Sequence, residues 1–235
     1  LLSLLLSFSC NNNSNYYNGM VSSAHPIASK IGLDILKNGG NAFDAAIAVH
    51  FALSVVYPNA GNIGGGGFLV YRLNNGDIGT LDFREKAPEK SYRDMYVDNI
   101  EGELKVDDKR SKIGHLASGV PGSVDGMVKI YDKFSTVDWK TLLEPSIKVA
   151  REGFGVTEKQ AKGLNDVKKS LVSANDHPIP FIKEDPWKVG DILTQKNLAN
   201  TLEEIKKSKR NGFYKGAVAE LIINEMKSGG GIITQ

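Results

Sequence analysis

Two short stretches decide the fold: Gly61–Phe68 (GNIGGGGF) and Leu81–Pro88 (LDFREKAP). In the first, four consecutive glycines lead into an apolar strand pattern, so the backbone must bend or pack where no side chain fits. In the second, Arg84 stands at the end of an apolar strand, between two carboxylates and before a proline. Together the stretches predict half of a site that recognises a small carboxylate, and neither supplies a nucleophile.

The glycine run does not fit a nucleotide-binding loop. Its spacing never gives G-x-G-x-x-G, and no Lys-Ser or Lys-Thr pair follows it to complete a P-loop. The run also precedes a strand instead of opening a helix, so no helix N-terminus is placed to hold a phosphate. We therefore interpret it as a place of tight packing or close backbone approach.

Arg84 has two interpretations that the residues alone leave open. A guanidinium at a strand end beside a glycine-lined space is well shaped to bind a carboxylate through two parallel hydrogen bonds. The alternative is a structural ion pair with Asp82 or Glu85. Asp82 is the more direct competitor, because side chains alternate along a strand and Asp82 shares the face of Arg84.

The flanking segments predict an α/β (α+β) architecture with helices layered on an antiparallel sheet. Strands are expected at residues 19–23, 68–73 and 78–83, with a turn at 74–77 and a further strand beginning at 232. Helices are expected to begin at Pro26 and Asn41, the second capped by Asp44 and buried. Later helices are expected at 123–134, 139–151, 158–171, 195–207 (capped by Thr194) and 217–227, with a surface excursion at 98–112 and a return to the sheet at 114–122.

The first 18 residues are interpreted as a signal peptide or lipoprotein leader with an asparagine-rich tether. An apolar run at residues 1–8 precedes Cys10, the single cysteine, and polar residues follow it. Three alternatives remain: cleavage after Ser9, lipidation of Cys10, or an accidental apolar start. The first two predict export, to the periplasm, to the outer membrane as a lipoprotein, or as a secreted protein. The chain begins at Leu, so we expect the reading frame to start upstream.

Composition and other motifs exclude several classes of function. A formal net charge of +2 in 235 residues gives no argument for a nucleic-acid partner. No G-x-S-x-G elbow is present, and the four histidines are too far apart to show metal-ligand spacing. We predict no cofactor, no metal and no catalytic residue within this chain.

Several motifs in order resemble the amino-terminal part of the large subunit of gamma-glutamyltransferases, also called gamma-glutamyltranspeptidases. The resemblance covers everything after residue 18, so 19–235 is expected to be one truncated portion of that subunit. Its motifs are GMVSSAHP (19–26), GGNAFDAA (39–46), GNIGGGGF (61–68), DFREKAP (82–88), SGVPG (118–122), FYKG (213–216) and GGGIIT (229–234).

The resemblance implies part of an N-terminal nucleophile hydrolase α/β/β/α sandwich, incomplete in this chain. It implies transfer of the gamma-glutamyl group of glutathione to water or an amino acid or peptide, with Arg84 holding the alpha-carboxylate. The family's nucleophile is the first threonine of a small subunit cut from the same precursor. Thr234 lies in a different motif, so the nucleophile is expected beyond the chain end and this fragment alone is predicted to be inactive.

Two rival functions remain. A cephalosporin or glutaryl acylase would share the architecture and would also need a carboxylate anchor. A non-catalytic exported binding protein would keep the scaffold without the nucleophile. The first rival is distinguished by its indifference to the alpha-amino group of the substrate, and the second by a different residue at the nucleophile position.

Overall fold

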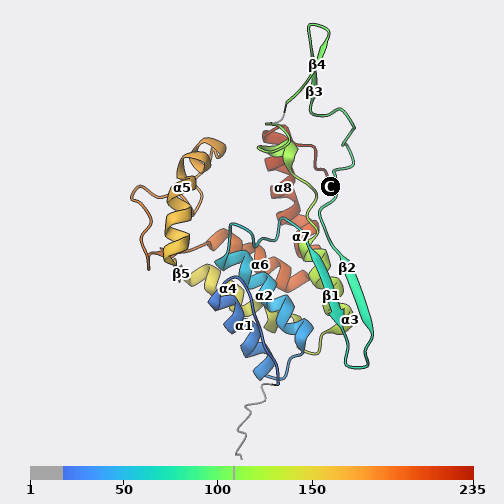
Figure 1. Ribbon diagram of the computed structural model, residues 1–235, viewed down its shortest axis with the longest axis vertical. Helices are drawn as coiled ribbons and strands as arrows, with labels where there is room; N and C mark the ends of the chain where they lie inside the picture. Colours follow the sequence, from blue (N-terminus) through green and yellow to red (C-terminus); the bar gives the residue numbers. More distant parts are fainter. Residues whose placement is uncertain (1–17, 108) are drawn as a thin grey trace, which may run out of the picture.

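The computed structural model describes residues 18–107 and 109–235. It has a helical body with one β-hairpin along its side and a second β-hairpin that projects away from it (Figure 1). Residues 1–17, which carry most of the predicted leader and Cys10, lie outside the described residues. Across the described part of the chain, no helix combines the length and the apolar character needed to cross a membrane.

The architecture is mixed α/β, as predicted, and every expected helix is present. The helices are α1 (Pro26–Lys37), α2 (Ala42–Val56), α3 (Ser123–Phe134), α4 (Trp139–Glu152), α5 (Glu158–Ala174), α6 (Lys196–Ser208), α7 (Asn211–Tyr214) and α8 (Gly216–Ser228), with a 3₁₀ turn η1 (His115–Ala117). The strands are β1 (Phe68–Arg72), β2 (Ile78–Asp82), β3 (Val97–Ile100), β4 (Glu103–Val106), β5 (Phe154–Gly155) and β6 (Ile192–Leu193), which form three antiparallel pairs.

Local capping fixes the start of the first two helices. The Nδ1 atom of His25 accepts a hydrogen bond from the Ile27 N–H at 3.2 Å and caps α1, which begins with proline as predicted. Asn41 and Asp44 form the predicted capping box at α2. Asp44 is fully buried and also accepts a hydrogen bond from the Thr136 hydroxyl at 2.8 Å, so it ties α2 to the segment before α4.

Helix α2 is the centre of the core. It is buried nearly all round, and it packs against α1, α3 and α4, while α4 in turn packs against α6. Phe51 has no exposed surface, and its ring lies edge-on to Trp139 of α4 with centroids 5.7 Å apart. The Trp139 indole N–H donates to the Ile205 carbonyl at 3.1 Å, so the buried aromatic ring is also paired.

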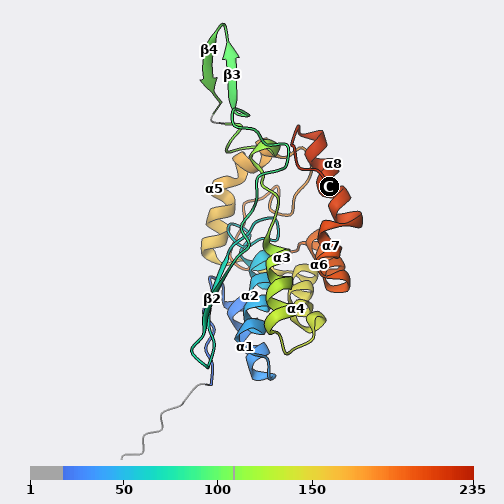
Figure 2. The same cartoon turned by 90° about the vertical axis from the view of Figure 1, so that its right-hand side faces the viewer.

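The hairpin β1–β2 forms the predicted antiparallel sheet and lies against the helical body (Figure 2). Tyr71 faces inward and packs edge-on to Phe43 of α2 and Phe134 of α3. The outward face carries Phe68, Val70 and Ile78, each more than 60% exposed. The predicted layering of helices on an antiparallel sheet is therefore confirmed for β1–β2, a sheet of two strands.

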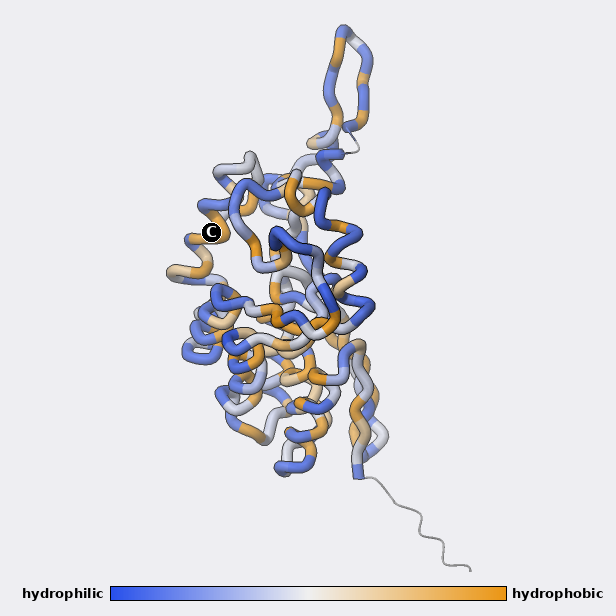
Figure 3. Tube along the Cα trace, turned by 90° about the vertical axis from the view of Figure 1, so that its left-hand side faces the viewer, coloured by the Kyte–Doolittle hydropathy of each residue, from blue (hydrophilic) through white to orange (hydrophobic). Residues whose placement is uncertain are grey.

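The predicted surface excursion is a second hairpin, β3–β4, which projects away from the body (Figure 1). Glu101 and Gly102 both have positive φ, as a tight two-residue hairpin turn requires. Hydrophobic and hydrophilic residues alternate along it (Figure 3), and Leu104 and Val106 are exposed. The pairing was not predicted, because the charged composition of this segment hid the strand alternation.

Four local predictions were wrong. The described segments 19–23 and 232–234 are not strands, because no described strand pairs with either. Residues 114–122 return to the body through η1 and a single bridge between Lys86 and Val120, instead of a strand. The cap residue of α6 is Gln195, not Thr194, and no side chain caps that helix.

Candidate functional site

The glycine run packs directly against the backbone that carries Arg84. A Cβ atom added at Gly66 would lie 2.5 Å from the Phe83 carbonyl oxygen, 2.6 Å from the Arg84 Cα and 2.7 Å from the Glu85 nitrogen. Real side chains do not reach such distances, so glycine is required here by close backbone approach. This confirms the interpretation of the run as a place of tight packing.

A third segment, residues 118–123, is hydrogen-bonded to both the glycine run and the segment after Arg84. The Gly65 carbonyl oxygen accepts hydrogen bonds from the Gly122 N–H at 2.7 Å and the Ser123 N–H at 3.0 Å. Lys86 and Val120 exchange backbone hydrogen bonds at 3.2 and 2.8 Å. The motifs at 61–68, 82–88 and 118–122 are therefore neighbours in space, although the sequence separates them widely.

Tyr214 of α7 brings a fourth motif to the same place. Its hydroxyl donates to the Pro121 carbonyl at 2.8 Å and accepts from the Asp125 N–H at 3.3 Å. Burial raises the pKa of this hydroxyl, which stays protonated and able to donate. Tyr214 therefore supports the loop that holds the glycine run.

The same turn of α3 carries an ion-pair cluster around Asp125, whose carboxylate binds Arg210 and Lys129, both at 2.7 Å. Burial acts to raise the pKa of Asp125, but the hydrogen bonds from Lys129 and Arg210 lower it overall. The carboxylate is therefore ionised at neutral pH and holds α7 against α3.

Arg84 follows the end of β2, and its side chain is 62% exposed. Its Nε lies 3.4 Å from Glu85 Oε2, and its guanidinium carbon lies 5.8 Å from the centre of the Phe68 ring. Asp82 binds the backbone N–H of Arg84 at 2.9 Å instead of the guanidinium. Of the two predicted ion pairs, the one with Glu85 forms, and such exposed pairs contribute at most about 1 kcal/mol.

The terminal nitrogens of Arg84, Nη1 and Nη2, have no hydrogen-bond partner in the described part of the chain. These two nitrogens carry N–H donors that can bind a carboxylate in a bidentate pair. The glycine run packs against the backbone of residues 83–85, so the Arg84 main chain is held in place while Nη1 and Nη2 can still bind a ligand.

The four histidines are dispersed in the structure as they are in the sequence. His25 caps α1, His115 lies 2.9 Å from Glu225 of α8, and His177 is exposed in a loop. Burial lowers the pKa of His50 to about 4, so its ring is neutral at pH 7. Within residues 18–107 and 109–235, no group of three or more histidine, cysteine, aspartate or glutamate residues is placed to hold a metal.

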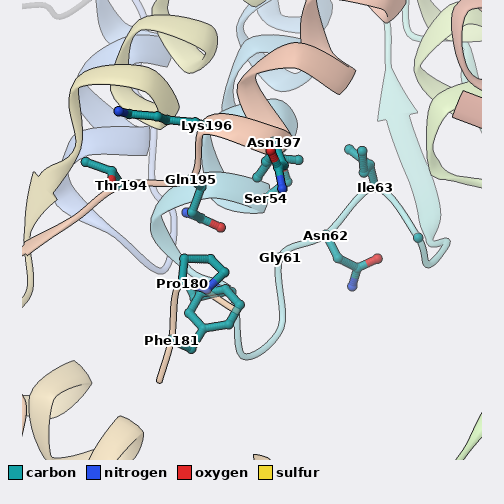
Figure 4. Close-up of a pocket in the computed structure, with 13 residues that line it drawn as sticks. Ser54, Gly61, Asn62, Ile63, Pro180, Phe181, Thr194, Gln195, Lys196 and Asn197 are labelled. Carbon is teal, nitrogen blue, oxygen red and sulfur yellow. The ribbon is translucent and has the colours of Figure 1, made fainter. Parts of the chain in front are cut away.

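A cavity of about 550 Å³ opens between the start of α6 and the loop after α2, and we name it the α6 cavity (Figure 4). It is lined by Ser54, Pro58, Gly61, Asn62, Ile63, Gly64, Pro180, Phe181, Thr194, Gln195, Lys196, Asn197 and Leu198. Arg84 is not among these residues. Residues 61–64 of its lining belong to the motif GNIGGGGF, but the sequence did not indicate a cavity there, because the walls come from three stretches of chain far apart in sequence (54–64, 180–181 and 194–198).

Comparisons with known proteins find matches over most of the chain. The family model described as gamma-glutamyltranspeptidase matches residues 28–235. The glutathione hydrolase proenzyme of Escherichia coli (strain K12) is 44% identical over 219 residues, which are 92% of this chain and 37% of that protein. The chain thus spans less than two fifths of the length of this curated relative.

Solved structures also match most of the chain. The chain is similar to gamma-glutamyltranspeptidase of Helicobacter pylori, with a TM-score of 0.89, 45% identity, and coverage of 94% of this chain and 63% of that one. Cephalosporin acylase from Bacillus halodurans is more distant, with a TM-score of 0.78, 26% identity, and coverage of 92% of this chain and 40% of that one.

Proposed function

Because the chain belongs to the gamma-glutamyltranspeptidase family, we propose that it forms part of the large subunit of a gamma-glutamyltransferase that acts on glutathione and related compounds. Residues 19–235 would be the amino-terminal portion of that subunit. In the assembled enzyme this portion would contribute to an N-terminal nucleophile hydrolase α/β/β/α sandwich. The partner is the small subunit cut from the same precursor.

In the proposed reaction, the nucleophile is the amino-terminal threonine of the small subunit. Its hydroxyl oxygen attacks the γ-carbonyl carbon, and the proton passes to the threonine's own amino group. The tetrahedral intermediate expels the leaving amine, which takes that proton, and a γ-glutamyl ester remains. Water or an acceptor amine then attacks the ester and frees the threonine hydroxyl.

The residue of this chain that takes part is Arg84, as the anchor of the substrate α-carboxylate. The supporting observation is its pair of unpartnered terminal nitrogens above a backbone fixed by Gly66. A bidentate pair with the α-carboxylate places the substrate, so its γ-carbonyl lies at a fixed distance from the anchor. The weak contact with Glu85 is easily displaced, because exposed ion pairs contribute little.

The test is Arg84→Ala in the full-length, processed enzyme, measured by release of the anilide from a γ-glutamyl anilide. With the substrate bound and the small subunit in place the pair would be buried, and loss of one partner of a buried charge pair costs about 2–5 kcal/mol. We expect kcat/KM to fall about thirtyfold to several thousandfold. Arg84→Lys keeps the positive charge but loses the paired N–H donors of the guanidinium. Its kcat/KM should therefore lie between those of Arg84→Ala and the wild type.

Arg93→Ala is the matched control, because the Arg93 side chain is 93% exposed and pairs with Asp94 alone at 3.4 Å. It should keep wild-type kinetics. Near wild-type efficiency of Arg84→Ala would remove Arg84 from the site.

The acylase alternative is kept because the B. halodurans cephalosporin acylase shares the fold. The higher identity to gamma-glutamyltranspeptidase favours the transferase. Turnover of a γ-glutamyl amide compared with its glutaryl analogue separates the two, since only the first bears an α-amino group. Equal turnover of both would favour the acylase.

We also propose that the protein is exported, as a periplasmic, outer-membrane or secreted enzyme. Support comes from the apolar run before Cys10 and the asparagines after it. Mass spectrometry of the mature N-terminus distinguishes a lipid on Cys10 from simple cleavage after Ser9. An unprocessed leader retained inside the cell would contradict export.

A further inference from the structure

The α6 cavity holds a polar group with a fixed orientation, the side chain of Gln195. Gln195 is 5% exposed, and its Nε2 donates to the Val55 carbonyl of α2 at 2.7 Å. Because the amide has one donor end and one acceptor end, this bond directs Oε1 away from α2. No described residue donates to Oε1, and Figure 4 shows that end of the amide directed into the cavity.

The start of α6 forms the same wall and favours negative charge. No side chain caps this helix of 13 residues, so its first N–H groups lack a capping partner and carry the positive end of the helix dipole. Asn197 lies at this end, and its side-chain amide has no partner in the described part of the chain. The cavity therefore presents a hydrogen-bond acceptor at Gln195 beside donors at the start of α6.

The lining also includes apolar side chains, among them Pro58, Ile63 and Phe181. A volume of about 550 Å³ falls within the range of small-molecule sites, which combine apolar walls with a few placed polar groups. An amine N–H, a carboxylate a few ångströms away and an apolar side chain are the matching ligand groups. These are the three parts of an amino acid or of the end of a short peptide.

We propose that the α6 cavity binds the acceptor amino acid or short peptide, with its carboxylate at the start of α6, its amine at Gln195 Oε1 and its side chain on Phe181. The inference rests on the proposed transferase function and assigns residues to its second substrate. It also explains why Gln195 is held by a buried hydrogen bond: the bond keeps Oε1 available as an acceptor.

The position relative to Arg84 fits the two substrates of one transfer. Gly64 lines the α6 cavity, and Gly66, two residues further on, contacts the Arg84 backbone. Two residues of backbone span at most about 7 Å. In transfer, the acceptor's free amine attacks the γ-glutamyl ester carbon, a C–N bond forms, the C–O bond to threonine breaks, and the amine proton goes to the threonine oxygen. Gln195 Oε1 accepts one N–H and leaves the lone pair for attack.

Asn197→Asp in the full-length, processed enzyme tests the site. The change is nearly isosteric, and a negative charge near the start of a helix does not weaken the helix. It places like charge beside the acceptor carboxylate, so the KM for L-phenylalanine as acceptor, with a γ-glutamyl anilide as donor, should rise about fivefold to fiftyfold. Asn200→Asp is the matched control, because it adds the same charge to α6 outside the cavity lining and should change KM less than about twofold.

Two further measurements, with other substrates, distinguish binding of the acceptor from other roles of the cavity. With L-phenylalanine amide as acceptor, which lacks the carboxylate, the effect of Asn197→Asp should disappear. Equal effects of the two variants, or the same effect on the amide, would overturn the proposal. A raised KM for glutathione with an unchanged KM for L-phenylalanine would place the leaving peptide in the cavity and reject the acceptor. Wild-type enzyme that releases no anilide would instead refute the proposed function.

Discussion

Replacement of Gly66 by alanine tests whether the glycine run positions Arg84. The new Cβ would meet the Phe83 carbonyl oxygen at 2.5 Å, about 0.9 Å short of the 3.4 Å at which ordinary contact begins. All three atoms it meets belong to the backbone of residues 83–85, so no side-chain rotation relieves the clash. The segment that carries Arg84 must therefore move by nearly 1 Å. A misplacement of that size costs about a hundredfold in rate.

The assay is kcat/KM for a γ-glutamyl anilide in the full-length enzyme, with the free energy of unfolding measured in parallel. Gly66→Ala should lower kcat/KM about a hundredfold and the free energy of unfolding by about 1–3 kcal/mol. Gly163→Ala in α5 is the control, because its Cβ would meet nothing within 4 Å, its φ is not positive and it lies outside the α6 cavity lining. Wild-type kcat/KM in Gly66→Ala would refute the reasoning, and the run would then serve the fold alone.

Two remaining predictions concern stability. Tyr214→Phe removes the hydrogen bond to Pro121 and should lower the free energy of unfolding by about 1–2 kcal/mol in urea denaturation, whereas Tyr92→Phe at an exposed ring should not. His50 has a folded pKa of about 4 against 6.5 when unfolded, so the unfolded chain binds the proton first and stability falls as pH drops from 6.5 towards 4. The loss should reach about 3 kcal/mol and be absent in His50→Leu; an unchanged pH slope in that variant would show that other groups cause it.

Elements with local determinants were predictable from the sequence. The capping box at Asn41 and Asp44 needs only residues three apart, and the structure contains it. The helix expected at 139–151 is α4, which ends at Gly153, a glycine with a positive φ directly after the last helical residue. The turn at Gly76 likewise joins the two predicted strands. In each case the determining contacts lie within a few residues.

Residues that act over long separations were not predictable. Gln195 bonds Val55, 140 positions earlier, and Tyr214 bonds Pro121, 93 positions earlier. No periodicity or spacing relates such pairs. Gln195 was even included in the predicted helix, with Thr194 as its cap, since threonine is the better capping residue by type. The buried bond to α2 decides otherwise.

Strand alternation did not identify the bonding partner of Asp82 correctly, because a closer backbone group competes with the Arg84 side chain. Strand alternation placed Asp82 on the face of Arg84 and favoured an ion pair between their side chains. The Asp82 carboxylate instead accepts the Arg84 backbone N–H at 2.9 Å, a short-range bond that aspartate forms readily at the end of a strand. The carboxylate is thereby occupied, and the guanidinium keeps its terminal nitrogens free.

Both parts of the candidate site depend on the end of α2. Two glutamine side chains bind its last carbonyls: Gln195 binds Val55 at 2.7 Å, and Gln160 of α5 binds Val56 at 2.6 Å. These carbonyls have no partner within their own helix, so without the glutamines they would be buried and unpaired. The chain leaves α2 here and enters the glycine run that supports Arg84. Two amide hydrogen bonds therefore fix the common base of the α6 cavity and the Arg84 anchor, and movement of that helix end would displace both together.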